Sequence, residues 1–430
     1  MSVSEKYLND HLRVLAQDIG VRLSGSPSER QAADYIADQF SRYGGSVCVE
    51  EFPMKQRTVA SEALEILLDG QWVSFPCSLF SSTPGTDGAT VEAPLVFFEA
   101  PAEIESRDLG ELTGRAVVHL GCHIESRDAY RRLIEAKPAF LLMVDIRYPG
   151  AVPLADGMFP AYTRDIGAVP TINVAYLDAW RWKTQGASSA RVRVQGGMQE
   201  STSQNVIADL PGDGSTDEIV YMGAHHDTQT DSVGADDNAT GVAGVLECAR
   251  VLGQRDRKRA IRIISFGCEE QLSVGSATYV RAHRDELRTN GRFMFNLDSY
   301  GSHLGWNVLI SNGPAELGGF LSPFFRIAGH SAVVRSEIMP YADHFPFVAA
   351  GVPSTTLLRD NCATGRFFHH RSDDEIDKVS MPLMTEILGA VTDCVATLSA
   401  CEGLPFPNVI PKLQRDQVEV FWEDLFGGWE

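Results

Sequence analysis

Residues 218–227 read Glu-Ile-Val-Tyr-Met-Gly-Ala-His-His-Asp, a short apolar run that gives way to histidine and aspartate. The apolar, β-branched part predicts a buried strand, and similar runs recur at 260–266 and 293–297. Segments with helical spacing lie between these runs, at 242–252 and 277–287. This alternation of strand and helix is typical of an α/β fold with a largely buried, mostly parallel sheet.

The same alternation continues toward the C-terminus. Further strands and helices are predicted at 308–310 with 317–328, at 332–338 with 344–350, and then at 353–358 and 380–399. We therefore expect residues 201–400 to form a mixed, mostly parallel central sheet flanked by helices. The aromatic tail at 401–430 is expected to dock back on the chain or to cover a subunit interface.

The N-terminal half has a different sequence pattern. Amphipathic helices are predicted at 8–19 and 29–43, so residues 1–57 are expected to be N-terminal helices of the same α/β domain. From 58 to 200, short predicted strands are separated by turns rich in Gly and Pro. These strands lie at 63–68, 94–98, 116–120, 140–144 and 171–174. The pattern predicts an inserted, β-rich domain.

Charge and hydrophobicity exclude several classes of partner. The 430 residues contain 37 Lys and Arg against 57 Asp and Glu, a formal net charge of −20. This charge opposes binding to nucleic acid or to an anionic membrane. We find no basic and apolar leader at the start and no uninterrupted apolar window of about 18 residues. The chain is therefore expected to be soluble and not exported.

The cysteine pattern points to a reducing compartment. The chain has 8 cysteines and none stands in a Cys-x-x-Cys pair. We expect reduced thiols at Cys48, Cys77, Cys122, Cys248, Cys268, Cys362, Cys394 and Cys401. The predicted location is the cytoplasm.

Ligand-type residues follow the predicted strands, where such a sheet places its binding crevice. His225 and Asp227 are separated by one residue, so both side chains leave an extended segment on the same side, and the carboxylate can orient the imidazole. His226 would then point the other way. The turn Gly234-Ala-Asp-Asp-Asn-Ala-Thr-Gly241 precedes a predicted helix. It is either a helix cap or a place where one of two adjacent carboxylates bridges metal ions.

Three later segments repeat this arrangement. Glu269 and Glu270 end a buried apolar strand, where carboxylates are costly unless they are paired or bind a metal. One of them can ligate while its neighbour stays free as a base. Asp298 ends the next strand, and the pair His369 and His370 lies in a loop after the last one. Structural capping or a solvated histidine pair are the alternatives for these segments.

A complete set of nitrogen and oxygen ligands emerges from these segments: His225, Asp237, Glu270, Asp298 and His370. Such ligands suit zinc or a similar divalent ion, and Co²⁺ and Mn²⁺ are alternatives because these ligands do not select sharply. Two histidines and three carboxylates are too many for one tetrahedral ion that keeps an open position. They fit two ions at roughly 3.5–4 Å that share a carboxylate.

These motifs resemble metallopeptidase family twenty-eight, the di-zinc aminopeptidase family. The resemblance rests on Gly-Ala-His-x-Asp, Gly-Ala-x-Asp-Asn-x-Thr-Gly, Glu-Glu, Asn-Leu-Asp and His-x-x-x-Asp, in the family's order and spacing. Segments around 18–36 and 203–212 are also similar to the family. Residues 58–200 resemble a protease-associated domain inserted before the catalytic sheet.

The resemblance implies a role for each position. It makes His225 and Asp298 ligands of one zinc ion, Glu270 and His370 ligands of the other, and Asp237 the bridge between them. Asp227 becomes the partner that orients His225. Glu269 becomes the general base that moves a proton to the leaving amine.

The sequence departs from the family pattern near the substrate. His369 stands where members often have Tyr, and it is a candidate for stabilising the oxyanion. Asp343 lies in Tyr-Ala-Asp-His-Phe-Pro-Phe, which resembles both the aminopeptidases and the glutaminyl cyclases, and it is a second candidate for contact with substrate. The segment after Glu270 also differs, so a loop beside the substrate pocket is expected to differ.

The leading hypothesis is a zinc exopeptidase that removes N-terminal residues from a peptide or amino-acyl substrate. The alternatives are another reaction of the family, namely carboxypeptidase action, deacylation of an amino-acid conjugate or glutaminyl cyclisation, and a non-catalytic binding protein. No nucleic acid or membrane partner is expected. The tail and the insert are candidate surfaces for a homo-oligomer.

Overall fold

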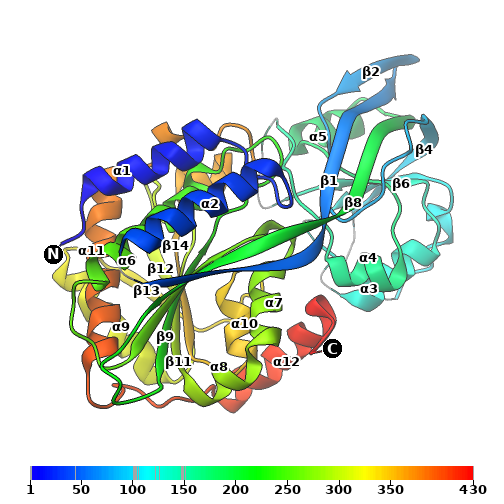
Figure 1. Cartoon of the computed structure of the whole chain (residues 1–430). Helices are drawn as coiled ribbons and strands as arrows, with labels where there is room; N and C mark the ends of the chain where they lie inside the picture. The colour runs from blue at the N-terminus through cyan, green and yellow to red at the C-terminus, as the bar shows by residue number, and fades with distance from the viewer. Residues whose placement is uncertain are drawn as a thin grey trace.

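The computed structural model describes residues 2–43, 45–99, 104, 106–121, 123–124, 126–146, 150 and 152–429. Within these residues, hydrogen bonding joins 14 strands in the order β13-β12-β14-β11-β9-β10-β8-β4-β5-β6-β7-β3, with β1 beside β8 and β2 beside β1 (Figure 1). The strands are β1 Ser46–Leu68, β2 Gln71–Phe75, β3 Ser78–Leu79, β4 Val91–Phe98, β5 Ala116–Leu120, β6 Phe140–Val144, β7 Thr171–Asn173, β8 Ser189–Leu210, β9 Ile219–His225, β10 Ala260–Phe266, β11 Gly291–Leu297, β12 Trp306–Asn312, β13 Ala332–Arg335 and β14 Ser354–Asp360.

Helices cover this sheet. They are α1 Glu5–Arg13, α2 Pro27–Arg42, α3 Arg127–Glu135, α4 Pro160–Ile166, α5 Tyr176–Thr184, α6 Gly241–Leu252, α7 Val274–Ala282, α8 Arg284–Asn290, α9 Ala315–Ile327, α10 His344–Ala349, α11 Met381–Ala400 and α12 Lys412–Phe426. Around β9 to β11, α1, α2, α6, α9 and α11 lie on one face and α7, α8 and α10 on the other (Figure 1).

The central strands are buried on both faces. In β9, Val220 and Met222 point into the hydrophobic cluster that contains α6 and α11. Tyr221 points the other way, into the cluster that contains Tyr279 of α7 and Phe347 of α10. Strands β10, β9, β11 and β14 run parallel, while β8 and β12 pair antiparallel with β10 and β14. The predicted α/β class with a mixed, mostly parallel sheet is confirmed.

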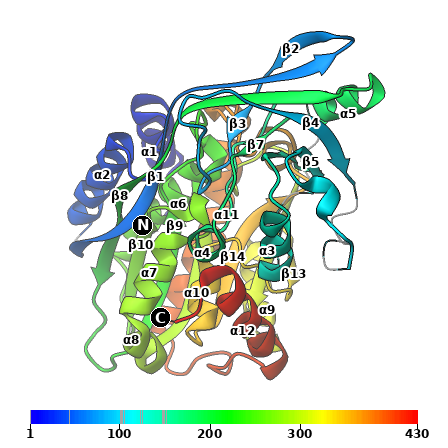
Figure 2. The ribbon, with the colours of Figure 1, turned by 90° about the vertical axis from the view of Figure 1, so that its right-hand side faces the viewer.

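Strands β1 and β8 form a long antiparallel ribbon that links the two halves of the molecule (Figure 2). Near one end β8 pairs with β10 of the central sheet, and near the other it pairs with β4. The domain boundaries expected at 57/58 and 200/201 lie inside this ribbon, where Lys55 pairs with Glu200. The ribbon is continuous through both boundaries, so the division into domains stays a prediction.

The insert contains the predicted strands and also helices that the sequence pattern did not indicate. Strands β4, β5, β6 and β7 run parallel. Helices α3, α4 and α5 connect or cover them, so the described part of the insert is itself an α/β unit. Its likeness to a protease-associated domain stays a prediction.

Three helix predictions need correction. Residues 1–57 were expected to be helical, but 46–57 belong to strand β1, where they pair with β8. The helix expected at 277–287 is two helices, because His283 leaves the helical conformation between α7 and α8. The His283 imidazole lies 2.9 Å from Glu50 of β1, which holds it at this break. The helix expected at 8–19 ends as an α-helix at Arg13 and continues as a π-helix over Val14–Ile19.

The C-terminal tail docks back on its own chain. Helix α12 packs against α10 and α4, and Trp422 on it is 1% exposed. Helix α11 is long and apolar enough to cross a membrane by length and composition alone. In this fold it packs against α1, α6 and α9, and residues such as Leu388 and Val391 belong to the hydrophobic core.

The cysteines of the described residues are free thiols. They are Cys48, Cys77, Cys248, Cys268, Cys362, Cys394 and Cys401, while Cys122 lies outside the described residues. The cytoplasmic location expected from this pattern stays a prediction.

Candidate functional site

The polar strand ends meet at one edge of the central sheet. His225 is the last residue of β9, and Asp298 directly follows β11. Glu269 and Glu270 lie in a short 3-10 helix, Glu269–Gln271, just after β10. The parallel register of β9, β10 and β11 brings these ends together, with His225 opposite Phe266. The last contribution comes from the loop after β14, which carries His369 and His370.

Asp237 lies at the centre of the cluster, and its two carboxylate oxygens face different histidines. Its Oδ1 lies 3.2 Å from His225 Nε2, and its Oδ2 lies 3.4 Å from His370 Nε2. Asp298 Oδ1 is 3.6 Å from the same nitrogen of His225, and Glu270 Oε2 is 3.0 Å from the same nitrogen of His370. The five predicted ligands therefore fall into two groups that share one carboxylate.

Asp227 connects two of the strand ends. Its Oδ1 lies 3.5 Å from His225 Nδ1, on the side of the ring opposite Asp237. The same carboxylate accepts the backbone N–H groups of Glu269 and Glu270, at 3.0 and 3.2 Å, and the hydroxyl of Ser24 at 2.7 Å. The backbone carbonyl of Asp227 lies closer to His225 Nδ1, at 3.2 Å, so the backbone and the carboxylate of this residue together position the imidazole, while the carboxylate alone fixes the Glu-Glu turn. The expected pairing of His225 with Asp227 is present.

His226 points away from this cluster, as the alternation of side chains predicts. Its ring nitrogens lie 3.0 Å from Ser265 Oγ and 3.4 Å from Gln204 Nε2. Burial lowers the pKa of His226 to about 4, so the ring is neutral at ordinary pH.

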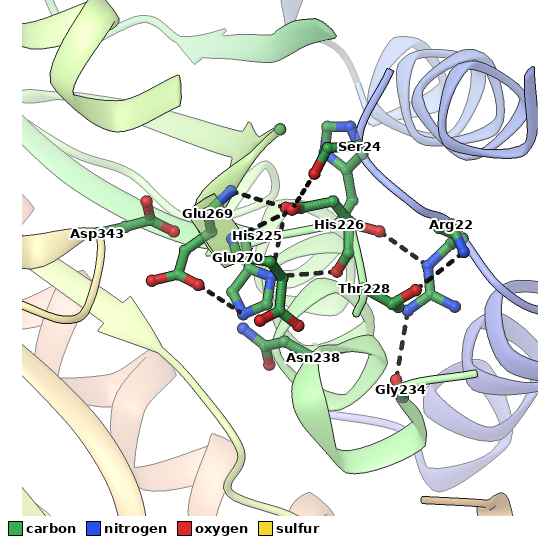
Figure 3. Close-up of polar contacts among 12 residues, drawn as sticks. Arg22, Ser24, His225, His226, Thr228, Gly234, Asn238, Glu269, Glu270 and Asp343 are labelled. Carbon is green, nitrogen blue, oxygen red and sulfur yellow. Dashed lines mark hydrogen bonds and ion pairs between the residues drawn. The ribbon is translucent and has the colours of Figure 1, made fainter. Parts of the chain in front are cut away.

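Glu269 differs from Glu270 in what surrounds it. Its Oε1 accepts the hydroxyl of Ser273 at 3.1 Å. Its Oε2 lies 3.9 Å from His225 Nε2, so the free end of the side chain faces the cluster without joining either group of ligands (Figure 3). Burial, together with nearby carboxylates such as Asp343, raises the pKa of Glu269 well above its usual value.

The cluster as a whole attracts positive charge. Burial alone lowers the pKa of an imidazole, but Glu269 and neighbouring aspartates raise the pKa of His225 well above its usual value. The pKa of His370 is raised in the same way by Glu270 and Asp237. Burial raises the pKa of Glu270 to about 7, although His370 opposes this. Such a site is stabilised by cations, either protons on the imidazoles or divalent metal ions.

The donor set fits metal ions. His225, Asp237 and Glu270 bring one ligand atom each within 4.8 Å of one another, and so do Asp237, His369 and His370. Imidazole nitrogens and carboxylate oxygens are the ligands that zinc and similar ions take in proteins. His369 is therefore close enough to Asp237 to act as a further ligand, with Nδ1 3.1 Å from its Oδ2.

Two supporting residues were not assigned roles from the sequence. Asp374 accepts the backbone N–H groups of Asp236 and Asp237, at 3.1 and 3.0 Å, and so fixes the turn that carries the central carboxylate. Its place four residues after His370 is the only sequence signal for it. Arg22 is fully buried. Figure 3 shows its guanidinium facing the backbone around His226 and Gly234.

The two candidates for contact with substrate lie in different places. His369 lines the cavity, and its ring stacks on His370 with the centroids 3.7 Å apart. Asp343 is fully buried beside Glu269 and accepts the hydroxyl of Ser276 at 2.6 Å (Figure 3). It is not among the described residues that line the cavity, so its position favours an indirect role.

A cavity of about 290 Å³ opens beside the cluster. Its described lining includes the whole predicted ligand set and Glu269. Leu272, from the segment expected to differ, also contributes, together with Met339, Tyr341 and Leu358. Residues of the insert complete the lining, and sequence reasoning did not anticipate them.

Comparison with known proteins places this chain beside a family of peptidases. Residues 205–395 match the model described as Peptidase family M28. Aminopeptidase YwaD of Bacillus subtilis (strain 168) is 25% identical over 445 residues, which span 98% of this chain and 90% of that protein.

Solved structures share the fold. A zinc aminopeptidase from Bacillus subtilis, BSAP, has a TM-score of 0.75 at 20% identity, covering 95% of this chain and 98% of that one. A peptidase M28 precursor from Shewanella amazonensis SB2B has a TM-score of 0.80 at 19% identity, covering 95% and 96%. At these identities the likeness establishes the common fold, including the insert that it covers.

Proposed function

This chain is a member of peptidase family M28 and a metallo-aminopeptidase, and we propose that it removes N-terminal residues from peptides with the help of two zinc ions. The observation that best supports the proposal is the way in which the two carboxylate oxygens of Asp237 face two different histidines. One carboxylate oxygen faces His225 and the other faces His370, so a single side chain serves two groups of ligands.

We assign one ion to His225 and Asp298, the other to Glu270 and His370, and the shared position to Asp237. This assignment follows the distances within each group, 3.6 Å in the first and 3.0 Å in the second. When bound, two such ions supply a water of lowered pKa and polarise the scissile carbonyl. BSAP, whose fold this chain shares, is a zinc aminopeptidase, and the same ligands also suit Co²⁺ or Mn²⁺.

Glu269 is the proposed general base. Ser273 holds Oε1, which leaves Oε2 on the side of the cluster to accept a proton and deliver it to the leaving amine. Asp227 orients His225 through the far side of its ring. The free α-amine of a peptide is a cation, and the carboxylates around the cavity favour it over a blocked N-terminus.

His369 is proposed to stabilise the oxyanion of the substrate. It lines the cavity beside Asp237, and an imidazole can donate a hydrogen bond to a developing negative charge. Its nearness to Asp237 also suits metal binding. Replacement by Tyr separates the two roles, because a phenol preserves the hydrogen-bond donor and is a much poorer zinc ligand.

The test is substitution of the proposed base. Glu269→Gln should keep the metal content of the parent and lower kcat for a free-amine dipeptide by about 10²–10⁴-fold. Glu316→Gln, at an exposed position on α9, is the matched control and should behave like the parent. Retained turnover in Glu269→Gln would contradict the mechanism. Cleavage of N-acetylated peptides, or cyclisation of N-terminal glutamine, would point to another reaction of the family.

A further inference from the structure

Leu272 adopts a backbone conformation that is rare for a residue with a side chain. Its φ and ψ are 65° and 61°, in the left-handed region, where the Cβ crowds the backbone and glycine is favoured. Such outliers persist only where the surroundings hold them, and they gather at functional sites. Leu272 lies three positions after Glu269 and lines the cavity. Glycine would form the same turn with less strain, so the turn alone does not account for a leucine here.

The turn that carries Leu272 is fixed to the proposed base. The N–H groups of Leu272 and Ser273 both donate to the carbonyl of Glu269, the second of them at 2.7 Å. Between them and the base, the side chain of Gln271 donates to the carbonyl of Lys55 on β1 at 3.0 Å. Leu272 is thereby held in a constant position relative to Glu269, and both residues border the same cavity.

The cavity has a polar side and an apolar side. The polar side carries the proposed metal ligands and Glu269. The apolar side is the edge of a hydrophobic cluster that has Met158 and Phe159 as buried members, and Leu272 and Tyr341 are partly buried against this cluster. Leu272 therefore lies where the two sides meet, with its backbone in the turn of the base and its side chain against the apolar wall.

The proton transfer proposed for Glu269 decides which part of the substrate lies beside this turn. Hydrolysis of the first peptide bond releases the nitrogen of the second residue as an amine, and Glu269 delivers a proton to that nitrogen. A group that transfers a proton lies within about 2.6–3.2 Å of the atom that receives it. The nitrogen of the second residue therefore comes next to Oε2 of Glu269. The Cα of that residue, one bond further, lies beside the turn that contains Leu272.

We propose that Leu272 determines specificity by narrowing the pocket for the side chain of the second residue of the substrate, so that this enzyme favours a small second residue, such as glycine or alanine, over a bulky one such as phenylalanine. The inference rests on the proposed aminopeptidase function with Glu269 as the base. The cavity of about 290 Å³ lies at the low end of the roughly 300–1,000 Å³ usual for ligand pockets. It has to hold parts of two residues, so the volume taken up by a leucine side chain limits the size of the second one.

The experiment uses the enzyme loaded with zinc and two series of dipeptides. One series has alanine first and glycine, alanine, leucine or phenylalanine second, and the other has the same residues first and alanine second. For the parent enzyme, kcat/KM for Ala-Phe should be at least about tenfold below that for Ala-Ala. Leu272→Ala and Leu272→Gly both remove the bulk of the side chain and should raise the ratio of Ala-Phe to Ala-Ala by about tenfold. The preferences in the other series should stay those of the parent, which a general loosening of the site would not give.

Two further features keep the experiment decisive. Leu272→Gly suits the left-handed backbone, so it covers the case in which Leu272→Ala does not fold. Leu413→Ala, at an exposed position on α12, is the matched control and should keep the ratio of the parent.

The outcomes separate the two proposals. A parent enzyme that cleaves Ala-Phe as well as Ala-Ala, or folded Leu272 variants that keep the ratio of the parent, would overturn the role of Leu272 and leave the aminopeptidase standing. A change confined to the preference for the first residue would also overturn it, because Leu272 would then contact the N-terminal side chain. Absence of metal-dependent cleavage for every free-amine dipeptide would overturn the proposed function and the role of Leu272 together.

Discussion

The hydroxyl of Ser273 donates a hydrogen bond to Oε1 of Glu269 at 3.1 Å, while Oε2 of the same carboxylate lies 3.9 Å from His225 Nε2. Ser273 is itself fully buried, and its N–H also donates to the carbonyl of Glu269 at 2.7 Å. Glu269 is therefore held at one oxygen and open at the other. Holding one carboxylate oxygen in place keeps the other oxygen in the same position relative to the substrate in each catalytic cycle, which favours proton transfer.

Ser273→Ala should slow catalysis without removing the metals. The substitution deletes the hydroxyl that holds Glu269, so the carboxylate samples more positions and is less often aimed at the substrate. We expect kcat to fall about tenfold, because each ~1.4 kcal/mol of lost transition-state stabilisation is tenfold in rate. KM should change little. Steady-state kinetics on a dipeptide, with zinc content measured in parallel, checks this, and Ser322→Ala on α9 serves as control.

Asp374→Asn should weaken metal binding. Asp374 accepts two backbone N–H groups of the turn that carries Asp237, and an amide in its place turns one acceptor into a donor. Loss of such a supporting group lowers metal affinity by about 10–100-fold. Zinc affinity is measured by competition with a chelator. The exposed neighbour Asp373→Asn is the matched control, and equal affinities in the two variants would refute the role of Asp374.

Arg22→Lys should destabilise the fold and loosen the site. The Arg22 side chain donates to the carbonyls of His226 and Val233, both at 2.8 Å, which lie at the two ends of the loop between His225 and Asp237. Lysine cannot reach both ends with one compact ammonium group. The free energy of unfolding should fall by about 3 kcal/mol, measured by urea denaturation of the chelator-treated protein. Arg326→Lys, at an exposed position, is the control and should leave the urea midpoint unchanged. An unchanged urea midpoint in Arg22→Lys would show that the buried contacts of Arg22 do not stabilise the fold.

Glu29 should make stability depend on pH. It is 1% exposed, and burial raises its pKa from the ordinary 4.5 to about 8. Between these two values the folded chain keeps a proton that the unfolded chain releases, so the free energy of unfolding falls as pH rises through this window. The glutamine in Glu29→Gln cannot ionise, so this variant should not lose stability through Glu29 as the pH rises. We therefore compare the Tm of the variant minus the Tm of the parent at two pH values. This difference should be larger at pH 8 than at pH 5 by at least about 2 °C.

The measurement for Glu29 uses calorimetry in the presence of chelator, so that metal binding does not add its own pH dependence. Glu419→Gln, at an exposed position on α12, is the control. A difference in Tm between Glu29→Gln and the parent that is the same at pH 5 and pH 8 would show that Glu29 does not titrate in this window.

Local pattern predicted the core of the fold well. The runs at 116–120, 140–144 and 260–266 match β5, β6 and β10 residue for residue, because each is an apolar run bounded by turn-forming residues. The candidate ligands could also be selected from the sequence, since each lies after a predicted strand or in the turn before a predicted helix. Residue types and spacing alone did not divide these residues into two groups; the family resemblance implied the division, and the two oxygens of Asp237 face different histidines in accord with it.

Features that depend on distant contacts were not accessible in this way. The break at His283 involves Glu50, which lies 233 positions earlier in the chain. The part of the cavity contributed by His123 and Phe159 depends on how the insert packs against α12, and no local sequence pattern predicts this packing. Asp374 is a single carboxylate in a polar loop, and only the folded chain shows which backbone it supports.

The measurement that tests the central claim most directly is a zinc titration of the metal-free protein, followed in the same samples by the rate of dipeptide cleavage. The shared carboxylate of Asp237 predicts saturation at two zinc ions per chain, with full activity reached only as the second ion binds. Saturation at one ion with full activity, or full activity in chelator with no metal bound, would contradict the account.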